Sequence, residues 1–162
     1  MYPEILTHFS DEEKRLYDKV KPLLFERGYE IRFCQFTDQK NEYIRIDIEN
    51  TTQHPITHRN CAEVSEILEN ILSLNIQIEV GSSGIDPYLT RLKDFETNLN
   101  ETVQILLSEK INNKSKYIGT LDVIRNNGVE LGSSLYKKLF IPFNLIRRSK
   151  RVIKEELYKG RI

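Results

Sequence analysis

Long apolar runs and export signals are missing from this sequence of 162 residues, and each absence excludes a class of protein. No apolar run approaches the ~18 residues that a membrane-spanning helix needs. The first residues, Met1-Tyr2-Pro3-Glu4, lack the basic segment and long apolar stretch of a secretory signal. We therefore expect a cytoplasmic protein that has no membrane partner.

Cysteine is also scarce, since the chain has only Cys34 and Cys61, and they form no Cys-x-x-Cys pair. His54 and His58 are four residues apart, but Pro55 lies between them, so one helical face is not expected to carry both. Tetrahedral zinc needs about four ligands at workable spacing. The sequence therefore predicts no metal and no cofactor, and two small apolar thiols in a reducing compartment.

Catalytic loops are missing as well, although Gly81-Ser82-Ser83-Gly84 resembles one at first sight. A nucleophile elbow needs one residue on each side of its serine, and this stretch is one residue too short. A phosphate loop needs a lysine directly after its glycines, and none follows before Lys93. We expect no catalysis and no small-molecule substrate. The stretch is predicted to be a domain joint, formed by Gly81, Ser82, Ser83, Gly84, Asp86 and Pro87.

Charge is balanced overall but divided between the two halves of the chain. Residues 1–85 have 9 Lys/Arg and 15 Asp/Glu, and residues 86–162 have 15 and 9. This asymmetry predicts two domains: an acidic one over 1–85 and a basic one over 92–162, with a joint at 86–91.

The first half has the patterns of two helices and three strands. Ser10-Asp11-Glu12-Glu13 is a capping box, and Gly28 ends the helix that follows, which Pro22 should kink or divide. Thr57 caps a second helix over about 58–73. Tyr29, Ile31 and Phe33 alternate with Glu30, Arg32 and Cys34 in the first expected strand. The second has Ile44, Ile46 and Ile48, and the third has Ile76, Ile78 and Val80. The order α-β-β-α-β predicts a two-layer domain.

The second half is typical of a small barrel with five short strands. The strands are indicated at Val103–Leu107, 117–124, Val129–Leu131, 139–141 and 146–153, with one or two short turns over 92–99 before them. Asn127-Gly128 is the strongest hairpin signal. The fold class is therefore α+β: a two-layer domain followed by a small β-barrel.

Basic side chains near the end of the chain are the best candidates for partner binding. The set is Lys137, Lys138, Arg147, Arg148, Lys150 and Arg151. Arginine can bind phosphate with two hydrogen bonds, so contact with RNA is expected. Base-specific reading is not expected, because no aromatic residue is interleaved in Arg147-Arg148-Ser149-Lys150-Arg151, and Tyr136, Phe140 and Phe143 are predicted to be core or hinge residues. Acidic side chains expected on exposed helix faces could attract a basic protein. They are Asp11, Glu12, Glu13, Glu63, Glu66 and Glu69.

Several short motifs together resemble the ribosome maturation factor RimP family over nearly the whole chain. In order they are Glu42–Ile48, Asn60-Cys61-Ala62-Glu63-Val64-Ser65, Ile78-Glu79-Val80, Ser82…Gly84-Ile85-Asp86…Leu89, Asp94-Phe95-Glu96 and 140–146. Three positions depart from the family pattern. Ser83 replaces a proline, Pro87-Tyr88 replaces Arg-Pro, and Arg59-Asn60 replaces two acidic residues. The missing arginine puts in doubt any partner contact of that side chain.

The resemblance implies an SH3-like or Sm-like barrel and a role without catalysis. The expected partners are the immature small ribosomal subunit, its rRNA, and a basic small-subunit ribosomal protein near the decoding centre. We expect a monomer that assists maturation of the subunit and then leaves. The alternative is a general RNA-binding module of Sm or SH3 type that is not tied to the ribosome. An enzyme is the least favoured hypothesis.

Overall fold

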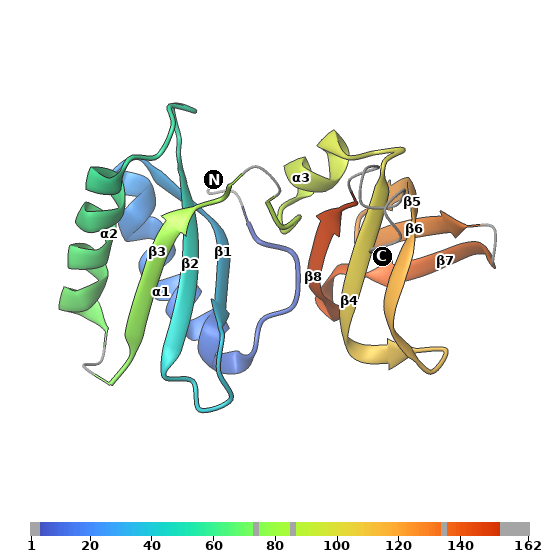
Figure 1. Ribbon diagram of the computed structural model, residues 1–162, viewed down its shortest axis with the longest axis horizontal. Helices are drawn as coiled ribbons and strands as arrows, with labels where there is room; N and C mark the ends of the chain where they lie inside the picture. The colour runs from blue at the N-terminus through green and yellow to red at the C-terminus, as the bar shows by residue number, and fades with distance from the viewer. Residues whose placement is uncertain (1–3, 73–74, 85–86, 134–135, 153–162) are drawn as a thin grey trace. The chain divides into compact units, whose positions relative to one another are not determined.

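The computed structural model describes residues 4–72, 75–84, 87–133 and 136–152, with only the backbone of 136 and 137 (Figure 1). The described chain divides into two compact units. The N-terminal unit holds residues 9–84, and the C-terminal unit holds residues 87–152 together with residues 4–8. Helices and strands occur in both, so the predicted mixed α+β class is confirmed.

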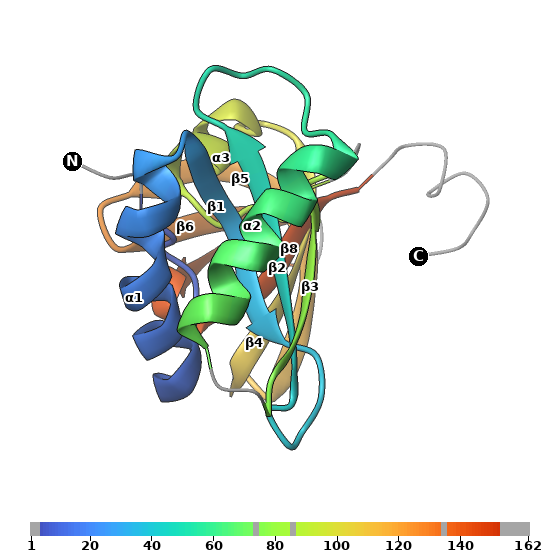
Figure 2. The same cartoon turned by 90° about the vertical axis from the view of Figure 1, so that its left-hand side faces the viewer.

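The N-terminal unit is one three-stranded sheet with two helices on a single face, as Figure 2 shows. Its elements follow in the order α1 (Asp11–Glu26), β1 (Tyr29–Phe36), β2 (Tyr43–Asn50), α2 (His58–Ile71) and β3 (Gln77–Ser82). Strand β2 lies in the middle, antiparallel to β1 and parallel to β3. The parallel pair requires a crossover, which α2 supplies. The predicted order α-β-β-α-β is confirmed.

Short capping motifs mark the first residues of both helices. Ser10 and Glu13 form the expected capping box, and Thr57 forms a second one at the start of α2. Gly28 follows α1 with φ +90°, as a glycine after a helix often does. The prediction that Pro22 could divide α1 is wrong, because the helix continues to Glu26. The carbonyl that the proline leaves without its usual donor belongs to Asp18, an exposed residue, so water can bind it.

A β-bulge at Arg32 changes which residues of β1 face the helices. Ile31 lies opposite Ile48, but Phe33 lies opposite Asp47, so the register of the two strands skips one position of β1. Beyond the bulge Cys34 pairs with Ile46 on the helix-covered face and is buried. Phe33 is buried as expected, but the expectation that Cys34 lies on the less buried side is wrong, because a bulge inserts one residue into one strand and β1 is buried on both faces beyond it.

The C-terminal unit begins with α3 (Leu92–Thr97) and continues as a five-stranded antiparallel sheet. Its strands are β4 (Thr102–Ile111), β5 (Lys114–Arg125), β6 (Gly128–Ser133), β7 (Tyr136–Pro142) and β8 (Ile146–Arg151), with η1 (Phe143–Leu145) before the last. The order across the sheet is β7-β6-β5-β4-β8. All five predicted strands are present, but the described pairings leave β7 and β8 at the two ends, so closure into a barrel is not shown.

The expected hairpin between β5 and β6 is present, but its turn is one residue earlier than predicted. Arg125 pairs with Gly128, so Asn126 and Asn127 form the turn and Gly128 begins β6. A Cβ at Gly128 would lie 2.4 Å from the carbonyl oxygen of Ile141 on β7. This glycine therefore permits close approach of two strands.

One hydrophobic core holds the C-terminal unit together. The ring centroids of Phe95 on α3 and Phe143 on η1 lie 5.2 Å apart within it. Its other fully or nearly buried members are Leu89, Val103, Ile105, Leu107, Tyr117, Leu121, Val129, Leu131, Ile141 and Ile146. They come from α3, η1, the preceding segment and strands β4 to β8, so burial of apolar area links all these elements.

Residues 4–8 belong to the C-terminal unit, although the sequence placed them with the acidic domain. Ile5 forms an isolated antiparallel bridge with Arg91. The N–H of Leu6 donates to the carbonyl of Thr90 at 2.8 Å, and that of His8 to the carbonyl of Ile146 at 2.8 Å. Backbone pairing of this kind does not depend on particular side chains, so no sequence motif predicts it.

Candidate functional site

The register of the C-terminal sheet gathers three basic side chains on one face. Arg148 on β8 lies opposite Leu106 on β4, and Leu106 lies opposite Lys116 on β5. Lys150 lies opposite Gln104 in the next row of the same face. Successive side chains of a strand point to opposite faces, so residues paired in register share a face. We call Lys116, Arg148 and Lys150 the basic face.

The other predicted partner-binding residues are dispersed. Arg147 lies at a bulge in β8, and its Nη1 donates to the carbonyl of His8 at 3.4 Å. Arg151 is exposed and pairs with Val103. Lys138 is exposed on β7, at the opposite end of the strand order from β8. The side chain of Lys137 lies outside the described part of the chain.

An aromatic side chain lies beside the basic face, which the sequence did not predict. The guanidinium carbon of Arg148 is 6.0 Å from the ring centroid of Tyr88. Next to Tyr88, the N–H of Leu89 donates to the carbonyl of Ser149 at 2.7 Å. The Ser149 hydroxyl in turn donates to the carbonyl of Leu89 at 2.8 Å. The segment around Leu89 therefore lies along the edge of β8 that β4 leaves open.

Lys116 was missed because it lies outside the basic stretch near the end of the chain. Asn112 and Asn113, both with positive φ, form the two-residue turn between β4 and β5. That turn pairs Ile111 with Lys114, but the register shifts between Leu106 and Ile111. No turn motif predicts such a shift, so the sequence did not indicate which residue of β5 would share a face with Arg148.

The predicted joint has a structural explanation at its first residues. Gly81 and Ser82 complete β3, opposite Asp47 and Ile48 of β2. A Cβ at Gly81 would lie 2.3 Å from Nη2 of Arg45, so the absent side chain makes room for that guanidinium. Glycine here therefore permits close packing of the Arg45 guanidinium against β3.

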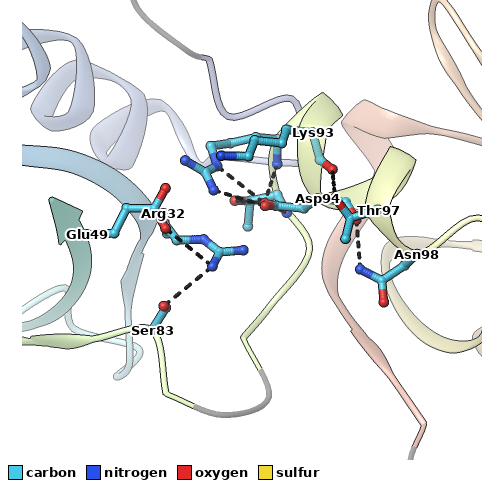
Figure 3. Close-up of polar contacts among 9 residues, drawn as sticks. Arg32, Glu49, Ser83, Lys93, Asp94, Thr97 and Asn98 are labelled. Atoms are coloured by element: carbon cyan, nitrogen blue, oxygen red, sulfur yellow. Dashed lines mark hydrogen bonds and ion pairs between the residues drawn. The ribbon is translucent and has the colours of Figure 1, made fainter. Parts of the chain in front are cut away.

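The remaining joint residues have different surroundings. The hydroxyl of Ser83 accepts a hydrogen bond from Nη1 of Arg32 at 3.4 Å, and Arg32 also pairs with Glu49 at 3.5 Å (Figure 3). Gly84 has φ +72° with open space where a Cβ would be. Pro87 is half-buried, whereas Asp86 lies outside the described residues. Gly81, Ser82 and Ser83 thus have contacts with the neighbouring strands of the sheet.

Arg45 is the centre of a charge network on the face of the sheet without helices. Its Nε donates to Asp47 at 2.7 Å, and its Nη1 pairs with Glu79 at 2.6 Å. Burial raises the pKa of Asp47 above its ordinary value, although the hydrogen bond and charge of Arg45 act in the opposite direction. This network joins β2 to β3 next to the joint.

The predicted acidic surface is only partly as expected. Glu13 is buried, with 1% of the residue exposed, so its place on an exposed face is wrong. Its carboxylate accepts hydrogen bonds from the N–H groups of Ser10 and Phe36. Glu63 is half-buried and accepts from the hydroxyl of Tyr29 at 2.8 Å. The exposed members are Asp11, Glu12, Glu66 and Glu69.

A buried charge pair between Arg91 and Asp94 organises the start of α3, and Asp94 belongs to the Asp94-Phe95-Glu96 motif. Asp94 Oδ2 accepts hydrogen bonds from the N–H groups of Thr90 and Arg91 at 3.1 and 3.0 Å. Its Oδ1 pairs with Nη2 of Arg91 at 3.0 Å. The amide of Asn98 donates to the Asp94 carbonyl and closes the other end of the short helix (Figure 3). These contacts fix Thr90 and Arg91, which directly follow Leu89.

Metal-ligand clusters and membrane-spanning helices are absent from the described residues. No three His, Cys, Asp or Glu side chains in the described ranges lie where they could hold a metal ion. Within the same ranges, no helix is both long and apolar enough to cross a membrane.

Fold and site together define a two-unit α+β protein with a helix-covered first sheet and a basic face on the second. Residues 19–86 match the family described as the RimP N-terminal domain. The match extends from the middle of α1 through all three strands of the first sheet to the joint. The N-terminal unit belongs to this family, and the resemblance to the ribosome maturation factor RimP family is confirmed.

Proposed function

We propose that this protein is a cytoplasmic ribosome assembly factor that binds the immature small subunit and performs no catalysis. The family of the N-terminal unit supports a role in ribosome maturation. The observation that carries the RNA contact is the basic face, where register brings Lys116 of β5 to the same side as Arg148 and Lys150 of β8. Cations held on one face of a sheet can follow a phosphate backbone without reading its sequence.

The C-terminal unit acts in this proposal as an SH3-like or Sm-like module. Its last strand, β8, follows a single 3-10 turn and pairs with β4, the first strand of the sheet. A chain that brings its last strand back to its first is the arrangement from which small barrels form. The basic face lies on β8 and β5, the two strands that flank β4.

The N-terminal unit supplies the second contact of the proposal. Exposed carboxylates on its helices, Glu66 and Glu69 on α2 among them, suit a basic ribosomal protein. Residue-level crosslinking to immature subunits tests this: crosslinks from α2 to a basic protein are expected. Crosslinks confined to rRNA would remove the acidic unit from the mechanism.

Co-sedimentation with immature small subunits, at low and moderate salt, tests the whole proposal. Lys116→Ala with Lys150→Ala should weaken binding at both salt concentrations. Lys93→Ala, which removes an exposed charge of α3, is the matched control and should bind as the wild type does. Wild-type protein that fails to sediment with the subunits would reject the proposal. The sedimentation coefficient of the free protein also tests the expected monomer.

The alternative function is a general RNA-binding module of Sm or SH3 type, which the same basic face favours. The two functions differ in their preferred partner. An assembly factor should prefer immature subunits to an equal mass of free rRNA. A general binder should prefer the free RNA and show a steep dependence on salt.

A further inference from the structure

We propose that Tyr88 and the basic face form a binding site for single-stranded RNA, in which an unpaired base stacks on the Tyr88 ring. This inference rests on the proposed function and narrows it, because it names the form of RNA that the face would hold. It begins from the contact between Tyr88 and Arg148, which comes from two segments far apart in the sequence.

The backbone places Tyr88 on the same side of the sheet as the basic side chains. Leu89 exchanges hydrogen bonds with Ser149, and both residues are buried. Tyr88 precedes Leu89, and Arg148 precedes Ser149. In extended chains neighbouring side chains point to opposite sides, so Tyr88 and Arg148 both point away from the core. The 6.0 Å between ring and guanidinium agrees with this.

A continuous row of side chains results. It runs from Tyr88 to Arg148, across Leu106, to Lys116, with Lys150 in the adjacent row. Adjacent strands lie ~4.8 Å apart, so the β8 and β5 positions are separated by roughly 10 Å. Cations at that spacing can bind successive parts of one backbone, while the ring at the end of the row accepts a base.

The chemistry favours an unpaired strand over a duplex. Aromatic rings and arginine guanidinium planes are the surfaces on which splayed bases stack. In a duplex the base faces are already covered by their neighbours, so the ring would have no partner. Tyr88 is half-buried, which holds the ring in place while part of it can still contact a ligand.

Arg147-Arg148-Ser149-Lys150-Arg151 has no aromatic residue among its charges, so the sequence alone did not predict base stacking. In the structure the aromatic residue beside these charges is Tyr88, which comes from the joint. Tyr88 is also one of the positions that depart from the RimP pattern, where Pro87-Tyr88 replaces Arg-Pro. The proposed stacking is therefore a property of this chain and does not follow from the family.

Fluorescence anisotropy with three labelled probes tests the site on the full chain. The probes are a short oligoadenylate, the same strand in a duplex with oligouridylate, and an abasic ribose-phosphate strand of equal length. Wild-type protein should bind oligoadenylate more tightly than the other two. Tyr88→Ala should weaken oligoadenylate binding roughly ten-fold and leave the abasic strand unchanged, whereas Tyr88→Phe keeps the ring and the affinity.

Matched variants separate stacking from charge. Tyr43→Ala removes a tyrosine that is 46% exposed on β2 and should change no affinity. Lys150→Ala should weaken all three probes and reduce the salt slope by about 0.7 for a single strand. Circular dichroism shows whether each variant is folded. If Tyr88→Ala does not fold, the comparison of wild type and Tyr88→Phe on the oligoadenylate and abasic probes still tests base stacking.

Three results would overturn the inference. They are equal affinity of wild type for oligoadenylate and the abasic strand, equal oligoadenylate affinity of Tyr88→Ala and wild type, and binding of a polyglutamate peptide in place of RNA. Parallel sedimentation with immature subunits keeps the two proposals apart. Subunit binding without base preference rejects only the stacking site. Base preference without subunit binding rejects only the assembly role.

Discussion

Glu13 on α1 accepts a hydrogen bond from the backbone N–H of Phe36, with Oε2 and N 2.7 Å apart. Its other carboxylate oxygen accepts from the N–H of Ser10 at 2.9 Å. One buried side chain thus closes the start of the first helix and fixes the end of the first strand. The capping box indicated the first contact, and only the tertiary structure shows the second.

Replacement of Glu13 by alanine should destabilise the N-terminal unit by roughly 2–4 kcal/mol, because it removes a cap and leaves the buried N–H of Phe36 without an acceptor. Urea unfolding followed by circular dichroism measures the change. Glu66→Ala, on the exposed side of α2, is the control and should lie within about 0.5 kcal/mol of the wild type. Equal losses in both variants would contradict the role of Glu13.

Gly81→Ala should displace the guanidinium of Arg45, since the new Cβ would lie 2.3 Å from Nη2 and 2.9 Å from Cζ. The expected cost is about 1 kcal/mol, from the weakened bonds to Asp47 and Glu79. Thermal unfolding provides the measurement. Gly84→Asn is the control, because its φ of +72° suits asparagine and no atom lies within 4 Å. If Gly84→Asn were the more damaging change, packing of Arg45 would not explain Gly81.

The pKa of Asp47 should rise further in Arg45→Gln, because the variant keeps the burial that raises it and loses the charge and hydrogen bond that lower it. A raised pKa means that the folded state holds the proton more tightly than the unfolded state. The associated stability is complete below the unfolded pKa and is lost as pH rises through the folded pKa. The variant should therefore lose more stability than the wild type between acidic and neutral pH.

Carbon-detected NMR of the Asp47 carboxyl group follows this titration, and urea unfolding at several pH values follows the stability. Each additional pKa unit corresponds to about 1.4 kcal/mol at neutral pH. Asp47→Asn combined with Arg45→Gln removes the titrating group, so the additional pH dependence should disappear. Its persistence would assign the effect to another carboxylate.

Tyr29 should ionise at higher pH than an ordinary tyrosine, because burial and then the hydrogen bond to Glu63 raise its pKa. Glu63→Gln keeps an acceptor but removes the negative charge, so the pKa of Tyr29 should fall toward its ordinary value. The stability that depends on the neutral phenol is lost as pH rises through the folded pKa, in the alkaline range. NMR titration of the tyrosine Cζ carbon provides the test, with Glu66→Gln as a control that should have no effect.

Local patterns were sufficient for the elements of this fold. Ser10 and Thr57 each cap a helix through contacts three residues away, and Ile44, Ile46 and Ile48 alternate along β2 with a buried face. Caps and periodicity depend on near neighbours, so they can be read from a single sequence. The order of elements in both units followed from them.

The sheet face on which each side chain lies, and the residues opposite it on the next strand, were harder to predict. The bulge at Arg32 moves Cys34 to the helix-covered face, and a register shift in β4 brings Lys116 level with Arg148. A shift of one residue turns every later side chain to the other face, and no short motif records it. The contact between Tyr88 and Arg148 was beyond prediction for a similar reason, because two distant segments must first meet along β8.

The pairing of residues 4–8 with Thr90, Arg91 and Ile146 makes the C-terminal unit a discontinuous domain. Its sequence is interrupted after His8, and the whole α-β-β-α-β unit is inserted there. During synthesis from the N-terminus, the inserted unit is complete long before Ile146 emerges. Residues 4–8 can therefore complete their pairing only after β8 has been synthesised. A fragment that starts at the joint would lack these residues of its own domain.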